Sequence, residues 1–168
     1  MTNNKYYGED SMGITHETLS NGNVLRFLVD RFNKDQTEVN FVSVLRCLRD
    51  SFIWIPCSLE MTDEDVEKFS NVSVGDVVQS SGDIKLVPDI LKNGDYLFFP
   101  VFSNCEQMGE DYGNNFSKIE KHFFEAMSMA MAKDDVCGIV LDAFTQPFII
   151  SKDAFEFIGN LPSEIDLE

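Results

Sequence analysis

The stretch IKLVPDIL-KNGD-YLFFPVFS, residues 84–103, carries the strongest structural signal in this sequence of 168 residues. Asn93-Gly94 lies between two apolar runs and favours a type I′ hairpin turn, because both central residues of that turn need positive φ. Pro88 in the first arm cannot donate a hydrogen bond to a neighbouring strand, which predicts an edge position. The second arm, 96–102, is apolar on both faces and is therefore predicted to lie inside a sheet.

Downstream of this hairpin, the pattern predicts a long helix and a second interior strand. Ser117-Lys-Ile-Glu120 has the spacing of a capping box and predicts the start of the helix. Its expected buried stripe comprises Ile119, Phe123, Ala126, Met127 and Ala130. Residues 136–141 form another apolar run. A strand, a helix and a strand over this length predict that 96–102 and 136–141 lie side by side and parallel.

The remaining elements complete one domain. Apolar stripes predict a helix that Asn23 caps and that residues 33–36 end, and a second helix after Thr37. Phe52-Ile53-Trp54-Ile55 is expected to form a strand covered on both faces and ended by Pro56, and Thr62 to precede an acidic helical turn. Residues 72–83 indicate a strand or a loop, 147–150 a short strand, and 151–159 a last helix. Residues 1–22 are polar and are expected to form a loose lead-in. The prediction is a single α/β (α+β) domain over 23–168, with a mixed sheet of about five strands and helices packed on it.

Composition excludes several classes of function. Thirteen Lys and Arg against 29 Asp and Glu give a net charge of −16, which argues against binding of nucleic acid or of an anionic membrane surface. Four scattered cysteines without a CxxC pair predict reduced, mostly buried thiols and no zinc site. Neither a secretion signal nor a run of about 20 apolar residues is present. A cytoplasmic protein without a cofactor is expected.

The order of these motifs resembles the N-terminal domain of the SseB-like, or enhanced-serine-sensitivity, family. The resemblance rests on the helix pair, Trp54-Ile55-Pro56, the 86–88 arm, Phe99-Pro-Val-Phe-Ser103 followed by Glu106, and the segments 138–141 and 147–150. It covers about residues 23–160 and implies a compact bacterial α/β domain with no catalytic residue to carry across. The family's Asn-Pro after the second strand is Asp142-Ala143 here.

Polar residues follow both interior strands and form one candidate site. The set comprises Ser103, Asn104, Glu106, Asp142, Thr145 and Gln146. Ligands of open α/β sheets bind at the carboxyl ends of such strands. The alternative is that Ser103 and Glu106 form a capping box at the start of a short helix and that 142–146 is only a hairpin loop.

A second candidate surface is the acidic patch of Glu60, Asp63, Glu64, Asp65 and Glu67. A calcium-binding EF-hand loop beginning at Asp63 is excluded, since its sixth position needs glycine and its twelfth needs glutamate, where Lys68 and Val74 stand. The patch is either a solvated surface or a contact for a basic partner protein.

An enzymatic alternative would use Cys105 or Cys137 with His122, or the carboxylates Glu106 and Asp142. Cys105 falls in the first turn of an expected helix, where the helix dipole would lower its pKa. GxGxxG, GxxxxGK[ST], HExxH and GxSxG motifs are all absent. The sequence therefore predicts a non-catalytic protein-interaction domain. The alternatives are an acidic, immunity-type inhibitor of a basic toxin, or a cysteine- or carboxylate-dependent enzyme.

Overall fold

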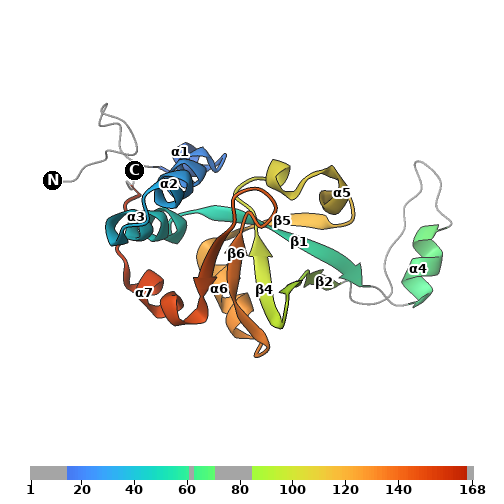
Figure 1. Cartoon of the computed structure of the whole chain (residues 1–168). Helices are drawn as coiled ribbons and strands as arrows, with labels where there is room; N and C mark the ends of the chain where they lie inside the picture. The colour runs from blue at the N-terminus through green and yellow to red at the C-terminus, as the bar shows by residue number, and fades with distance from the viewer. Residues whose placement is uncertain (1–14, 61–62, 71–84, 166–168) are drawn as a thin grey trace.

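A computed structural model describes residues 15–60, 63–70 and 85–165, which form two β-sheets and the helices around them (Figure 1). The helices are α1 (His16–Leu19), α2 (Asn23–Lys34), α3 (Glu38–Arg49), α4 (Asp63–Ser70), α5 (Glu110–Gly113), α6 (Phe123–Met131), α7 (Phe155–Asn160) and the 3₁₀ helices η2 (Cys105–Met108) and η3 (Lys152–Ala154). The strands are β1 (Phe52–Glu60), β2 (Lys85–Pro88), β3 (Leu91–Asn93), β4 (Tyr96–Val101), β5 (Ser117–His122), β6 (Val136–Leu141) and β7 (Phe148–Ser151). The predicted α+β class is confirmed.

The central pair of strands is the one that the sequence predicts. β4 and β6 are parallel neighbours, with Phe99 in register with Ile139. Both side chains are fully buried. β3 and β7 pair antiparallel on either side, giving a mixed sheet of order β3-β4-β6-β7. The predicted interior position of the segment around Phe99 is therefore confirmed.

The hairpin between β3 and β4 differs in detail from the prediction. Asn93 pairs with Tyr96, so that Gly94 and Asp95 are the two central turn residues. Gly94 has a φ of 63°, whereas Asp95 is not among the described residues with positive φ. The turn is therefore not type I′, and a positive φ at the first central residue alone is typical of type II′.

The first arm of this hairpin is divided between two sheets. Only β3 pairs with β4, while β2 joins β1. β2 is the outer strand of an antiparallel sheet of order β2-β1-β5, which agrees with the predicted edge position of Pro88. The segment 72–83 lies outside the described residues.

The predicted helix start at Ser117 is wrong, because Ser117–His122 is strand β5. All six residues are in register with Phe52–Cys57 of β1. The capping-box pattern is a local preference, and here the hydrogen bonds of a long-range strand pairing replace it. The helix begins at Phe123, where His122 Nδ1 accepts a hydrogen bond from the N–H of Phe124 at 3.1 Å. Four residues of the predicted stripe, Phe123 to Ala130, are buried on α6.

The prediction that Pro56 ends its strand is also wrong, since β1 continues to Glu60. The N–H and C=O of one residue point to the same side of a strand, and the C=O of Pro56 accepts from Asp89 at 2.9 Å. The missing N–H therefore faces the β2 side, where pairing begins only at Cys57. β1 is not fully covered either, because 39% of Phe52 is exposed.

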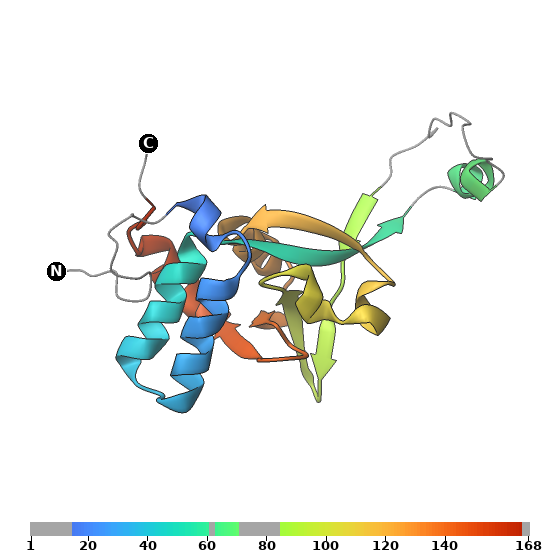
Figure 2. The same ribbon diagram turned by 90° about the horizontal axis from the view of Figure 1, so that it is seen from above.

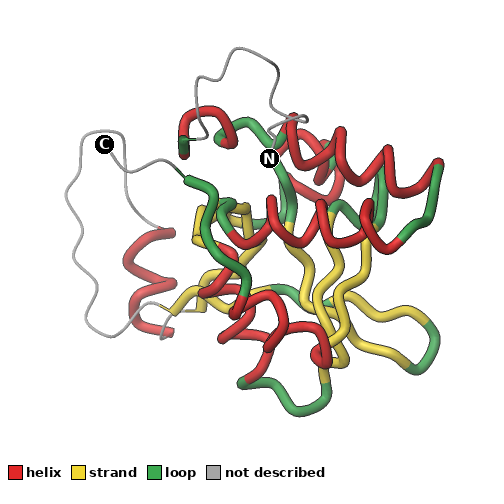
Figure 3. Tube along the Cα trace, turned by 90° about the vertical axis from the view of Figure 1, so that its left-hand side faces the viewer, coloured by secondary structure: helices red, strands yellow, loops and turns green. Residues whose placement is uncertain are grey.

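The two sheets are joined at Trp54 and Phe102. Their backbones exchange hydrogen bonds of 2.8 and 2.9 Å. Helices lie on both sides of the strands (Figure 3). α2 and α3 lie side by side at one end of the molecule, and α4 projects beyond β1 and β2 at the other (Figure 2). None of the described helices is both long enough and apolar enough to cross a membrane.

The helix starts near the N-terminus also differ from the predicted ones. The expected loose lead-in covers 1–22, but from Thr15 onward the chain is ordered as α1, whose Leu19 is buried. The N-cap of α2 is Gly22, so Asn23 is the first helical residue and not the cap. α3 follows Thr37 as predicted, and the Thr37 side chain caps it by accepting a hydrogen bond from the N–H of Asn40. The described part of the predicted acidic turn forms the two-turn helix α4.

Candidate functional site at the ends of β4 and β6

The carboxyl ends of β4 and β6 lie together, and a buried Ser103–Asp142 pair joins the loops that leave them. The N–H of Ser103 donates to Asp142 Oδ1 at 2.9 Å, and its hydroxyl donates to Oδ2 at 2.7 Å. Each residue is only 2% exposed. The predicted capping box is therefore wrong, because the Ser103 hydroxyl is bonded to Asp142 and η2 has Asn104 as its N-cap without a side-chain bond.

Further side chains of the predicted set form a second group of bonds around Gln107, a residue that the sequence did not single out. Gln107 donates to Asn104 Oδ1 at 3.0 Å and accepts from Thr145 Oγ1 at 2.8 Å. Asn104 also donates to the C=O of Asn21 at 2.9 Å. The loop after β4 is thus tied to the loop after β6 and to the lead-in to α2.

The two outermost members of the predicted set lie apart from this group. Gln146 donates to Asp30 on α2 at 3.4 Å. Glu106 is exposed on η2 and lies outside the hydrogen bonds described above. We call Ser103, Asn104, Gln107, Asp142 and Thr145 the strand-end lock. Within it the polar atoms satisfy one another, so that the arrangement holds the two loops in place.

The start of α2 packs against the strand-end lock. Gly22 has a φ of 77°, and a Cβ at this position would lie 2.6 Å from the C=O of Ser103. Glycine is required there both by the left-handed backbone and by the close approach. Arg26, one turn later, places its Nε 4.0 Å from Asp142 Oδ2. This cation partly compensates the buried carboxylate.

Loss of the Asp142 carboxylate is expected to destabilise the fold. Asp142→Ala leaves the buried N–H and hydroxyl of Ser103 without an acceptor and places alanine at a φ of 50°. Together these effects should lower the free energy of unfolding by about 2–4 kcal/mol. Asp142→Asn keeps the shape and tolerates this backbone, so its cost should be about 1 kcal/mol or less. Urea unfolding of both variants measures these changes. Equal losses of free energy of unfolding would contradict the role of the Asp142 side chain as the acceptor for Ser103.

The same residue should make stability depend on pH. Burial raises the pKa of Asp142 above its ordinary value, although hydrogen bonds from Ser103 and the charge of Arg26 oppose the shift. Between the ordinary and the raised pKa, the folded protein binds a proton that the unfolded chain has released. The free energy of unfolding contributed by this group therefore falls as pH rises through that window, upward from about pH 4. Urea unfolding of the wild type and of Asp142→Asn over this pH range tests the prediction. The free energy of unfolding of the wild type should fall relative to that of Asp142→Asn as pH rises. A difference that stays constant with pH would contradict the prediction.

Phe102, Tyr112 and Phe144 form an aromatic cluster, and Phe102 and Phe144 are sequence neighbours of the lock residues Ser103 and Thr145. Phe144, in the loop after β6, is 50% exposed. Its ring centroid lies 4.8 Å from that of Tyr112 on α5, in an edge-on arrangement. Both rings also contact the buried Phe102, at centroid distances of 5.9 and 6.0 Å. The one feature of the sequence that could have indicated this cluster is a phenylalanine within the loop 142–146, whose other residues are small or polar.

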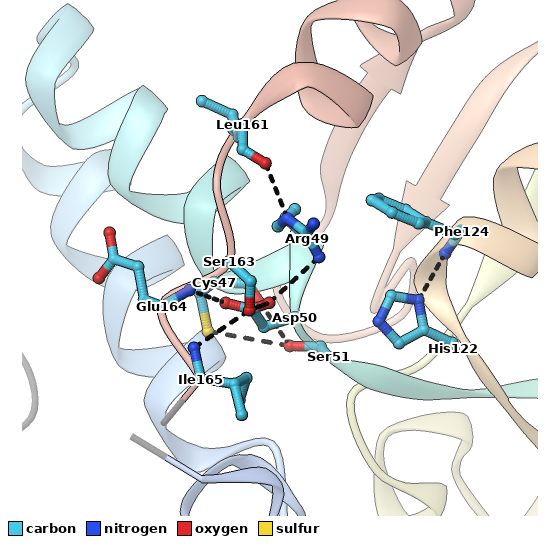
Figure 4. A network of polar contacts seen from close by, with 10 residues as sticks. All are labelled: Cys47, Arg49, Asp50, Ser51, His122, Phe124, Leu161, Ser163, Glu164 and Ile165. Atoms are coloured by element: carbon cyan, nitrogen blue, oxygen red, sulfur yellow. Dashed lines mark hydrogen bonds and ion pairs between the residues drawn. The ribbon is translucent and has the colours of Figure 1, made fainter. Parts of the chain in front are cut away.

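The sequence also gave no indication of a second polar network, which fixes the described end of the chain (Figure 4). Asp50, 3% exposed at the C-terminal end of α3, accepts from the hydroxyl of Ser163 at 2.7 Å and from the N–H of Glu164 at 2.9 Å. Arg49 contacts the same carboxylate at 3.3 Å and donates to the C=O of Leu161 at 2.8 Å. A carboxylate is unfavourable at this end of a helix. Its partners, more than 110 residues away in the sequence, compensate for that position.

The cysteines give little support to an enzymatic site. All four are free, but only Cys47 and Cys57 are buried, so the prediction of mostly buried thiols is wrong for the exposed Cys137. Burial raises the pKa of Cys105, opposite to the predicted dipole effect. Burial also lowers the pKa of His122. The described ring contacts of His122 are with Phe52 and Phe124.

The acidic patch lies at the far end of the molecule from α2 and α3. Glu60 ends β1, and Asp63, Glu64, Asp65 and Glu67 belong to α4, which projects from the body (Figures 1 and 2). Glu60, Asp63, Glu64 and Glu67 are exposed, as is 47% of Val66. Across 15–60, 63–70 and 85–165, no three His, Cys, Asp or Glu side chains are grouped so that they could hold a metal ion. The acidic patch and the strand-end lock thus lie in separate parts of the structure.

Comparisons with protein-family models, with curated proteins and with solved structures give no match to this chain. The resemblance to the SseB-like family stays a prediction.

Proposed function

We propose that this chain is a non-catalytic domain that binds a protein partner, and that the contact centres on the loops at the ends of β4 and β6. The observation that carries the proposal is the half-exposed Phe144, whose ring packs on Tyr112 and on the buried Phe102. Exposed aromatic side chains held in one orientation are typical of the residues that dominate protein interfaces.

The polar groups of the strand-end lock support a binding role over a catalytic one. The hydroxyl of Ser103 donates to Asp142, and Thr145 donates to Gln107. A nucleophile or a general base needs an atom that can reach a substrate. Here these atoms are bonded within the protein, and both Ser103 and Asp142 are buried.

The charge of the chain favours a basic partner. A net charge of −16 raises the rate at which a basic protein associates and makes the complex sensitive to salt. The acidic patch on α4 and β1 adds long-range attraction to this contact. We place the protein in the cytoplasm, because its four free cysteines suit a reducing compartment, and we assign it to the SseB-like type on the motifs quoted above.

Capture of a partner tests the proposal. Wild type, Phe144→Ala and Phe27→Ala are immobilised at equal density and exposed to lysate of the cells that make the protein. Phe27 is the matched control, because it is 54% exposed on α2, outside the proposed contact. We expect wild type and Phe27→Ala to retain the same discrete basic protein at low salt and to release it at about 0.5 M salt, where charges are screened within a few ångströms. Phe144→Ala should retain at least about tenfold less, as expected for a central interface aromatic.

Two results would contradict the proposed function. One is the absence of any discrete protein above the background of an unrelated acidic protein. The other is equal retention by Phe144→Ala and Phe27→Ala, which would place the contact elsewhere on the molecule.

A further inference from the structure

A hollow of about 490 Å³ lies beside the strand-end lock. It is lined by Met108, Gly109, Glu110, Asp111, Tyr112 and Phe144. Its residues thus come from the loop after β4 and the loop after β6, the two segments that the lock holds together. The hollow therefore lies at the proposed interface.

The rings of Tyr112 and Phe144 form two walls of this hollow. Their planes meet at 64°, so a group that enters can lie on the face of one ring and against the other. Phe116 packs behind Tyr112 with a centroid distance of 4.8 Å, which holds that ring in place. The faces of aromatic rings carry partial negative charge and attract cations.

A hydrogen bond strengthens this property of Tyr112. Its hydroxyl donates to Asp89 Oδ2 at 2.7 Å. Burial and the contact with Asp89 both raise the pKa of Tyr112, so the phenol keeps its proton and remains a donor. A carboxylate at the hydroxyl makes the ring more electron-rich, and it adds negative charge close to the hollow.

The charged side chains around the hollow are acidic. Glu110 and Asp111 are exposed at its rim. The basic residue Lys118 lines an adjacent hollow that shares Gly109 and Glu110. The described lining of the Tyr112–Phe144 hollow itself contains no basic residue. Aromatic walls under a rim of carboxylates complement a flat cation.

We propose that the Tyr112–Phe144 hollow binds an arginine side chain of a basic segment in the partner protein. The guanidinium group stacks on the exposed ring of Phe144 and the side of Tyr112, and its N–H groups face Glu110 and Asp111. Arginine fits better than lysine, because its planar, weakly hydrated group both stacks on rings and donates to carboxylates. This inference rests on the proposed function and specifies the chemistry of the contact.

Peptide titrations followed by NMR test the inference on the full chain. The probes are short capped glycine-serine peptides with one central arginine, citrulline or lysine. Citrulline has the shape of arginine without its charge. We expect the arginine peptide to shift the ring signals of Tyr112 and Phe144 saturably, with lysine weaker and citrulline at least about threefold weaker. Phe144→Leu should weaken arginine binding by about 3- to 30-fold, while Phe144→Tyr should retain it.

Matched variants separate a local effect from a general one. Phe157→Leu changes an aromatic residue that is 48% exposed on α7 and should leave arginine binding unchanged. Glu110→Gln/Asp111→Asn should weaken binding and reduce its salt dependence, whereas Asp153→Asn/Glu156→Gln, which removes two exposed charges elsewhere, should not. Circular dichroism confirms that each variant is folded.

The outcomes distinguish this inference from the proposed function. Absence of saturable shifts, equal binding of arginine and citrulline, tighter binding of lysine, or indifference to Phe144→Leu would each overturn the arginine site. Capture of a partner that depends on Phe144 would then leave the proposed function standing. Arginine binding without any captured partner would support the site and refute the function.

Discussion

Replacement of Phe99 by alanine is expected to lower the free energy of unfolding by about 3–5 kcal/mol. The side chain is fully buried on β4, and Phe99 is in register with Ile139 of the parallel strand β6. Removing the ring loses its burial and leaves a cavity, because the two central strands are held in register and cannot close over the space.

Urea unfolding monitored by circular dichroism measures this loss. Tyr96→Ala is the matched control, since this aromatic residue lies on the same strand with 65% of its surface exposed, and it should change stability by about 1 kcal/mol at most. Phe99→Leu leaves a smaller cavity and should give an intermediate value. Similar losses for Phe99→Ala and Tyr96→Ala would mean that β4 does not occupy the centre of the core.

Gly138→Ala is expected to cost about 3 kcal/mol or more, although it adds a single methyl group. A Cβ at this position of β6 would lie 2.3 Å from the C=O of Ile150 and 3.0 Å from the Cα of Ser151. Both atoms belong to the backbone of β7, which pairs directly with β6. The clash therefore requires the strands to separate, and no side-chain rotation can relieve it.

The control for this substitution is the same change at Gly159. An added Cβ there meets no atom within 4 Å. Since Gly159 lies in α7, alanine should leave stability unchanged or raise it by about 0.5–1 kcal/mol. Thermal and urea unfolding of the two variants test the difference. A Gly138→Ala variant as stable as Gly159→Ala would be incompatible with the described pairing of β6 and β7.

The parts of the fold that could be predicted are those in which local pattern and tertiary environment agree. The runs around Phe99 and Ile139 are apolar on both faces, and only a covered interior position suits such runs. At Ser117 the local pattern and the tertiary environment disagree. The capping-box pattern favours the start of a helix, whereas all six residues of 117–122 pair with β1 as a strand. The pairing prevails, and a sequence read in short windows cannot reveal a partner some 65 positions away.

The candidate site shows the same division. Parallel strands end at the same edge, so the proximity of Ser103 and Asp142 could be predicted from the two strands alone. The bonds that Gln107 makes, and the contact of Tyr112 with Phe144, depend on how two loops fold back on each other. Neither the bonds of Gln107 nor the contact of Tyr112 with Phe144 corresponds to a periodic pattern in the sequence. The Arg49–Asp50 network joins segments more than 110 positions apart in the sequence, and it could not be predicted for the same reason.

The two sheets draw on overlapping stretches of the polypeptide. The sheet β2-β1-β5 uses residues from Phe52 to His122, whereas β3-β4-β6-β7 uses residues from Leu91 to Ser151. Neither sheet can be excised as a fragment without cutting the other. During synthesis, β1 must wait for β5 and β4 must wait for β6, so the first sheet is complete only after His122 and the second only after Ser151. A nascent chain of this protein is therefore exposed to chaperones and proteases until its last strands emerge.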